Sequence, residues 1–228
     1  MKVGIIQSNF LPWRGYFDFI REVDLFVLED DLQYTKNDWR NRNRIKSPRG
    51  SEWITVPVSY KHTAQLIYDT PIDYGQPWAR KMLNRIRESY RRAPYFESYF
   101  LELGELLLRP VASISELNIA LIRWVCRHLE INTPLRFSQA YHPQGVKAER
   151  VIDILRKVGA TAYLSGPAAR NYIIPERFEQ AGIQLEYKQY HYPEYEQLHP
   201  PYDPAVSVLD LLFMQGPNSK IYLECSRE

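Results

Sequence analysis

The chain has 228 residues, which is enough to bury a substantial hydrophobic core in one domain or at most two. Hydrophobic residues make up 45% of the chain and charged residues 25%, a globular composition that excludes an intrinsically disordered protein. The formal net charge of +2 excludes a general attraction of the molecule to nucleic acids or membranes, although local patches can still bind.

The N-terminus runs directly into a strand pattern. Residues 3–6 form a continuous apolar run that is too short for a helix and is typical of a strand buried on both faces. The sequence contains no charged leader followed by a long apolar segment, and no apolar run approaches the roughly 20 residues that cross a bilayer. We therefore expect a cytoplasmic protein without a membrane partner.

A helix and a second strand follow the first strand closely. Tyr16, Phe19 and Ile20 recur at helical spacing within residues 15–22, and residues 24–29 form the next apolar run. A strand, a short helix and another strand with tight connections form a βαβ unit. Such units cross over with a right hand and build parallel sheets.

The middle of the chain is predicted to be mostly helical. The hydrophobic period is lost after residue 30, a polar loop is expected at 36–44, and a strand is expected at 53–58. Helices then fill residues 76–130, where Ser113 and Glu116 have the spacing of a capping box.

The last third returns to alternating helices and strands. A helix at 148–158 is expected to end at Gly159 in a left-handed conformation. Two further strands, a proline-rich segment and a final helix are predicted in chain order at 161–164, 183–190, 193–204 and 208–214. The sequence therefore predicts a single α/β domain over residues 1–228, with a mostly parallel, Rossmann-like sheet and a helical insertion at about 76–130.

Polar segments follow three of the predicted strands. They begin at Gln7, at Asp30 and at Ser165, and the last continues through Gly166 to Arg170. Ligands of open α/β sheets bind beyond the carboxyl ends of the strands, where loop amides and helix N-termini converge. We therefore expect these three ends to meet at one ligand site. Neighbouring residues of an extended chain point in opposite directions, so only one of Asp30 and Asp31 is expected to face it.

The predicted loop is strongly basic. Six positive charges occur within residues 36–49, and Lys36, Arg40 and Arg42 are interleaved with Trp39. Arginine binds phosphate or carboxylate oxygens with two parallel hydrogen bonds, so the run suits an anionic substrate. The alternative is a solvated loop that only keeps the protein soluble. A second basic run, on the helix near residues 80–92, is more simply interpreted as the solvent-exposed face of an amphipathic helix.

The histidines and cysteines do not form a metal motif. The five histidines lack helical i,i+4 spacing, so no metal site is predicted, and no residue pattern identifies a cofactor. His191, at the end of a predicted strand, is the best candidate acid or base. Cys126 lies in an apolar helical pattern and is expected in the core, whereas Cys225 near the C-terminus is a candidate reactive thiol.

Six sequence stretches match those of a known family and occur in the same order. They are Gln7–Phe17 (QSNFLPWRGYF), Asp30–Tyr34 (DDLQY), Trp39–Asn43 (WRNRN), Tyr163–Gly166 (YLSG), Tyr195–Gln197 (YEQ) and Ser207–Asp210 (SVLD). With these stretches the chain resembles the WbqC-like family. One departure is Ser8, where the family usually has proline. The resemblance implies a role in making or modifying small metabolites, often amino sugars or amines.

A remoter similarity concerns the scaffold. Trp13 and Tyr16 occupy the places where nucleotidylyltransferases of the HIGH type carry the two histidines of H-x-G-H, and Ser165 to Arg170 corresponds to their second phosphate-binding turn. This similarity implies a nucleotidylyltransferase-like fold. It argues against nucleotidyl transfer itself, because neither aromatic side chain supplies a positive charge to the phosphate in the transition state.

Taken together, these features suggest a transferase that acylates or aminoacylates an amine-bearing metabolite, such as an amino sugar nucleotide of surface-polysaccharide biosynthesis. Asp31 or His191 would take the proton of the amine, and Asn43 or loop amides would stabilise the acyl oxyanion. The candidate substrate-binding residues are Gln7, Tyr16, Gln33, Lys36, Trp39, Arg40, Arg42, Ser165, Gly166, Arg170, Tyr195 and Gln197. Two alternatives stay open: a nucleotidylyltransferase-like nucleotide-binding enzyme, and a non-catalytic protein that binds RNA or a partner.

Overall fold

The computed structural model describes residues 1–171 and 173–223, and its centre is a five-stranded parallel sheet. The strands lie in the order β5-β2-β1-β6-β7. Their bounds are Lys2–Ile6 (β1), Leu25–Leu28 (β2), Leu135–Phe137 (β5), Ala162–Ser165 (β6) and Gln184–Tyr187 (β7). The expected mixed α/β fold with a Rossmann-like parallel sheet is therefore confirmed, and β5 is a strand that the sequence did not predict.

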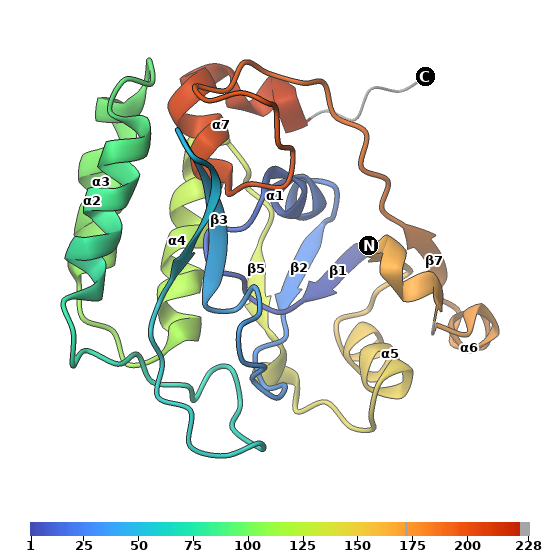
Figure 1. Cartoon of the computed structure of the whole chain (residues 1–228). Helices are drawn as coiled ribbons and strands as arrows, with labels where there is room; N and C mark the ends of the chain where they lie inside the picture. The colour runs from blue at the N-terminus through green and yellow to red at the C-terminus, as the bar shows by residue number, and fades with distance from the viewer. Residues whose placement is uncertain (172, 224–228) are drawn as a thin grey trace.

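Helices cover both faces of this sheet (Figure 1). On one face, α1 (Arg14–Arg21) and α4 (Ile114–His128) pack on the side chains of Phe26, Leu28 and Leu164. On the other face, α5 (Ala148–Lys157) and α6 (Pro175–Gln180) contribute to a second cluster. The strands that follow α1 and α4 lie on one side of β1, and the strands that follow α5 and α6 lie on its other side. The strand order therefore reverses between β1 and β6, and open sheets bind ligands at such a switch point.

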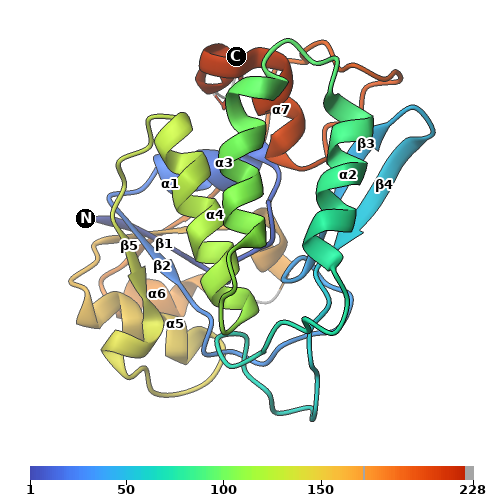
Figure 2. The ribbon, with the colours of Figure 1, turned by 90° about the vertical axis from the view of Figure 1, so that its left-hand side faces the viewer.

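A further layer lies outside α4 (Figure 2). It contains the antiparallel hairpin of β3 and β4, two long helices and a C-terminal helix, with the bounds Arg42–Ser47 (β3), Gly50–Thr55 (β4), Trp78–Tyr90 (α2), Phe96–Leu108 (α3) and Val208–Gln215 (α7). The helical content predicted for residues 76–130 is present. Three 3-10 helices complete the described elements: Ser138–Tyr141, Pro167–Asn171 and Gly216–Leu223.

The hairpin corrects two predictions. The predicted loop at 36–44 ends where β3 begins at Arg42, and the strand predicted at 53–58 spans residues 50–55. Burial alternates over the first four residues of β3, where Arg42 and Arg44 are partly exposed and Asn43 and Ile45 are buried, and the last two residues, Lys46 and Ser47, are both buried. The first part of the strand therefore has the alternation of a half-buried β-strand, but its polar composition concealed the period from the sequence.

Local signals predicted several boundaries well. The Ser113 hydroxyl accepts a hydrogen bond from the Glu116 amide at 3.3 Å, which is the first half of the predicted capping box. The second half differs, because the Glu116 carboxylate accepts from the Ala112 amide at 3.0 Å, one residue before the N-cap. Gly159 follows α5 with φ of 72°, the left-handed conformation expected there. Cys126 is buried, and Cys225 lies outside the described residues. No helix among the described residues is long and apolar enough to cross a membrane.

Candidate functional site

The carboxyl ends of the central strands meet at one edge of the sheet. β1 pairs in parallel with β2 on one side and with β6 on the other, so the segments after Ile6, Leu28 and Ser165 leave the sheet in the same direction. Figure 1 shows β1 and β2 side by side at this edge. The segments that begin at Gln7, Asp30 and Ser165 are therefore brought to the same edge of the sheet, and their meeting at one ligand site stays a prediction.

Arg40 reaches this edge from the segment before the hairpin. One nitrogen of its guanidinium, Nη1, contacts the Asn9 side-chain oxygen, and Nη2 lies 3.3 Å from the Gln7 side-chain oxygen. The Asp38 carboxylate is 3.7 Å from the same guanidinium, and the Arg40 side chain is 15% exposed. Neutral amides thus orient the arginine beside the end of β1 while part of it faces solvent.

Two buried side chains donate hydrogen bonds to backbone carbonyls of the β1–α1 loop (residues 7–13). The Asn43 amide nitrogen donates to the carbonyls of Phe10 and Leu11, at 3.1 and 2.8 Å, and the Tyr16 hydroxyl donates to the Gln7 carbonyl at 3.0 Å. Leu11 has φ of 42°, a left-handed conformation that is strained for a leucine and needs such support. The donor groups of Asn43 and Tyr16 are therefore used within the protein, and both side chains position the loop.

Asp30 braces the loop from the side of β2 and α4. This buried carboxylate accepts a hydrogen bond from the Ser8 amide at 2.7 Å and another from the Ser115 hydroxyl. The Asn118 amide donates to the Ser8 hydroxyl at 3.2 Å and to the Arg40 carbonyl at 2.8 Å. The start of α4 therefore fixes both the loop and Arg40. The sequence did not reveal this role of Ser115 and Asn118.

Asp31 is ion-paired. Its carboxylate lies 2.5 Å from the Arg150 guanidinium and accepts a hydrogen bond from the Ser138 hydroxyl. Arg150 also pairs with Glu29 at 2.8 Å, and burial raises the pKa of Glu29 above its usual value in spite of that pairing. One guanidinium thus compensates two carboxylates at the end of β2, so the Asp31 carboxylate is engaged within the fold.

The remaining residues predicted for this edge make fewer polar contacts with the rest of the fold. The Ser165 hydroxyl is buried and lies 3.4 Å from the Tyr163 hydroxyl, while Gly166 is half-buried. Three further side chains are exposed: Arg170, whose guanidinium lies 4.7 Å from the Tyr187 ring centre, Lys36, whose amine lies 4.3 Å from the Tyr60 ring centre, and Gln33.

Tyr195 and Gln197 belong to a polar cluster under α7. The hydroxyls of Tyr195 and Tyr90 each donate to the buried carboxylate of Asp210 at 2.9 Å, and Gln197 exchanges two hydrogen bonds with the backbone of Asp203. Burial raises the pKa of Asp210, although the hydroxyl donors favour its ionised form. This cluster secures the start of α7.

The C-terminal segments also contact the β1–α1 loop. The Val208 amide donates to the Pro12 carbonyl at 2.9 Å, and the Trp13 ring packs at 5.0 Å from the Tyr190 ring and 6.1 Å from the Tyr192 ring. His191, between these two tyrosines, is exposed. Trp13 packs against other rings and Tyr16 is buried, so both are used within the fold.

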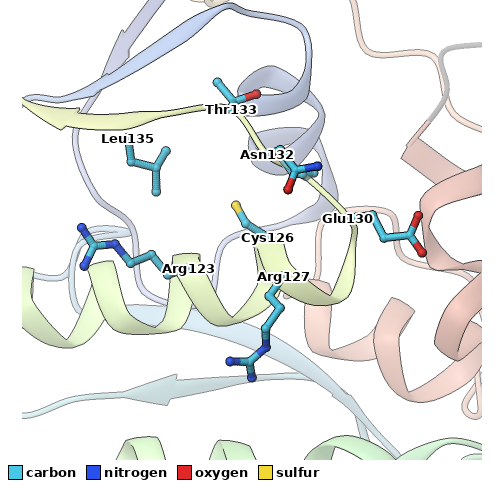
Figure 3. A pocket seen from close by; sticks show the side chains of 8 residues that line it. Arg123, Cys126, Arg127, Glu130, Asn132, Thr133 and Leu135 are labelled. Carbon is cyan, nitrogen blue, oxygen red and sulfur yellow. The ribbon is translucent and has the colours of Figure 1, made fainter.

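A hollow in the surface lies elsewhere (Figure 3). It has a volume of about 640 Å³ and opens between the C-terminal part of α4 and the amino end of β5, with Arg123, Cys126 and Leu135 in its lining. This is the edge of the sheet opposite to Arg40. Within the described residues, no group of three or more His, Cys, Asp and Glu side chains is arranged to hold a metal ion.

Comparisons with known proteins show the family of the chain. The model of the WbqC-like protein family matches residues 7–222, which begins at Gln7 of the candidate site. The chain is also 42% identical to the uncharacterized protein Rv1507c of Mycobacterium tuberculosis over 230 residues, which cover 100% of this chain and 99% of that protein. No solved structure matches the chain. With a family match and a full-length relative of this identity, the chain belongs to the WbqC-like family.

Proposed function

We propose that the protein is a transferase that binds a phosphate-containing metabolite at the carboxyl edge of its sheet and acylates or aminoacylates an amine of that metabolite. An amino sugar nucleotide used in surface-polysaccharide synthesis is the substrate we favour. The observation that carries the proposal is the half-buried guanidinium of Arg40, which neutral amides of Gln7 and Asn9 hold beside the end of β1. The Asp38 carboxylate, 3.7 Å away, offsets part of this positive charge, but it also accepts hydrogen bonds from the Thr35 hydroxyl and the Trp39 amide. The arginine can therefore still bind a phosphate through its charge and its donors.

Several parts of the fold hold the β1–α1 loop in place, and this supports the same site. Asp30, Asn43, Tyr16 and the start of α7 each hold the β1–α1 loop through a hydrogen bond, and Trp13 extends its contacts to the segment after β7. Such support keeps Gln7 and Asn9 in fixed positions around Arg40. Binding sites need this preorganisation, because ordering loose groups at the moment of binding costs affinity.

The chemistry requires an amine that attacks the carbonyl carbon of an acyl thioester or an aminoacyl ester. A new C–N bond forms, the C–S or C–O bond of the donor breaks, and the proton of the amine passes through a base to the leaving group. His191 suits the role of the base better than Asp31, which is held in an ion pair by Arg150. The Ser8 and Phe10 amides of the β1–α1 loop already donate within the fold, so the other backbone amides of this loop suit the oxyanion better than Asn43, whose amide nitrogen already donates twice.

Arg40→Ala tests the proposal. Purified protein is incubated with an amine-bearing uridine diphosphate sugar and with acyl and aminoacyl donors, and mass spectrometry measures the acyl group added to the sugar. We expect wild-type protein to form the product and Arg40→Ala to bind the sugar nucleotide about tenfold or more weakly in calorimetry, because a charge-assisted hydrogen bond contributes roughly 1.5–3 kcal/mol.

Two variants complete this experiment. Arg49→Ala removes a guanidinium whose side chain is 84% exposed and is expected to behave like wild type. His191→Gln is expected to lower kcat by about a hundredfold while binding stays close to that of wild type. Equal binding and equal product formation by Arg40→Ala and Arg49→Ala would contradict the proposed site.

A further inference from the structure

Two tryptophans form an exposed pair beside the hairpin. Trp39 is 42% exposed and Trp53 is 40% exposed, and their ring centres lie 5.4 Å apart with an angle of 40° between the rings. Trp53 belongs to β4, which with β3 forms the outer hairpin in Figure 2. Adjacent large aromatic rings left in solvent cost hydration free energy, and such surfaces commonly mark a binding site.

Arg42 completes this surface. Its guanidinium carbon lies 4.2 Å from the centre of the Trp53 ring, and within the described part of the chain the guanidinium makes no ion pair. Its buried Nε atom also has no hydrogen-bond partner among the described residues. The Nη1 and Nη2 atoms of Arg42 also donate no hydrogen bond to the described residues, so the outer end of this stacked guanidinium can add hydrogen bonds to a planar ligand beside the rings.

Trp39 of the ring pair is linked to Arg40 and to the β1–α1 loop through short contacts. The Trp39 amide donates to the Asp38 carboxylate at 2.7 Å, the Arg40 guanidinium lies 3.7 Å from that carboxylate, and the Phe10 amide donates to the Trp39 carbonyl at 2.9 Å. Burial opposes the ionised form of Asp38, but the Thr35 hydrogen bond and the charges of Arg40 and Arg42 lower its pKa below the usual value. Arg40, Asp38 and Arg42 therefore share one electrostatic environment.

The charges around the ring pair favour a small ligand over a nucleic-acid strand. Glu52 pairs with both Arg49 and Arg85, at 2.9 Å each, and Asp203 lies 3.8 Å from Arg44. These carboxylates neutralise the arginines that would otherwise bind the phosphates of a nucleic acid. A polynucleotide site instead needs a continuous row of available positive charges.

We propose that Trp39, Trp53 and Arg42 form a stacking platform for the base of a nucleoside diphosphate whose phosphates bind at Arg40. This inference rests on the proposed function, because it adds the nucleoside half to the same phosphate site. Every base offers a flat π-face, so the platform accepts purine and pyrimidine rings alike. The two tryptophans would then set the preference for a nucleotide-linked metabolite over a simple phosphate ester.

Calorimetry with three probes tests the platform: inorganic pyrophosphate, UDP and ADP. We expect wild-type protein to bind UDP and ADP about tenfold or more tightly than pyrophosphate. The double variant Trp39→Ala/Trp53→Ala is expected to lose this advantage and to bind pyrophosphate within about twofold of wild type, whereas Trp39→Phe/Trp53→Phe, which keeps aromatic rings, should retain most of it. Leu101→Ala, which changes a side chain that is 72% exposed on α3, is the control for loss of apolar surface.

The outcomes separate this inference from the proposed function. Equal affinity of wild type for pyrophosphate and UDP, or UDP binding by the double alanine variant equal to that of wild type, would overturn the platform and leave the phosphate site standing. Failure of all three probes to bind, or binding that Arg40→Ala leaves unchanged, would overturn the phosphate site together with the platform. Thermal melting of each variant verifies that the fold is retained.

Discussion

Asp30 shows at the scale of one residue how the candidate site is held in place. Its buried carboxylate accepts hydrogen bonds from the Ser8 amide and the Ser115 hydroxyl, groups that are far apart in the sequence. A carboxylate removed from water requires such donors, because an unpaired buried charge is strongly destabilising. Asp30 therefore supports the loop that carries Gln7 and Asn9, and it is unavailable for substrate.

Asp30→Ala is expected to destabilise the protein. The substitution leaves the Ser8 amide without its acceptor in a buried position, so the free energy of unfolding should fall by about 1.5–3 kcal/mol. Urea denaturation followed by circular dichroism measures the change. Asp69→Ala is the matched control, because Asp69 is exposed and its side chain makes no hydrogen bond or ion pair with the described residues. A loss no greater than that of the control would show that Asp30 does not brace the loop.

Residue roles at this site were only partly predictable from the sequence. The basic run indicated Arg40, and the end of the first strand indicated Gln7. The sequence did not indicate Asn118, which lies within the apolar pattern of α4, because its partners Ser8 and Arg40 are 110 and 78 positions away. Asn43 looked like a possible catalytic donor, and only the positions of the Phe10 and Leu11 carbonyls reveal what its amide contacts.

At the scale of elements, the start of α1 depends on one glycine. A Cβ atom added to Gly15 would lie 2.3 Å from the Trp13 ring, which folds over the first turn of the helix and packs on Tyr190. A side chain at position 15 therefore requires the ring to move. This contact explains why tryptophan and glycine occur together at the beginning of the helix.

Gly15→Ala is expected to lower the free energy of unfolding by about 1–3 kcal/mol through overpacking, and to change the near-ultraviolet circular dichroism of the tryptophans. Gly104→Ala in α3 provides the contrast, since a Cβ there would meet only Leu83 at 3.9 Å. In that helix interior alanine should instead add up to about 1 kcal/mol. Equal effects of the two substitutions would exclude the proposed contact with Trp13.

The hairpin is joined to α2 by Glu52, and this link should depend on pH. Hydrogen bonds from Arg49, Arg85 and Ser47 lower the pKa of Glu52 to about 2. Because the folded pKa lies below its usual value of 4.5, the stabilisation is fully present above pH 4.5 and is lost as the pH falls towards 2.

Glu52→Gln should therefore reduce stability at pH 7 by up to about 1 kcal/mol, a small effect because its two arginine partners are solvent-exposed. The difference from wild type should shrink as urea denaturation is repeated at falling pH below 4.5. Glu179→Gln, at an exposed glutamate that makes no ion pair with the described residues, serves as the control. A constant difference from pH 7 to pH 3 would rule out the titration of Glu52 as its cause.

The elements themselves were predicted unevenly. Strands with continuous apolar runs, such as β1 and β2, and helices with a regular apolar face were found close to their observed bounds. β3 was not found, because three of its six residues are arginine or lysine and its burial comes from the covering loop and helices. β5 has only three residues and joins the sheet through β2, so its sequence carries little signal of its own.

At the scale of the whole molecule, the parallel sheet followed from the βαβ start, but the order of its strands did not. That order depends on which face each crossover covers, and it places the switch between β1 and β6 beside Gln7. We propose that the chain folds as one domain, because a single apolar cluster includes side chains from Phe10 to Leu223. One cooperative transition in urea is the expected result, and two separated transitions would contradict it.

A crystal structure of the protein with UDP would show whether the nucleotide binds at Arg40. We expect density for the diphosphate within hydrogen-bond distance of the Arg40 guanidinium, at the end of β1, with the base near Trp39 and Trp53. Density for the ligand only at the opposite edge of the sheet, in the hollow lined by Arg123 and Cys126, would contradict the account.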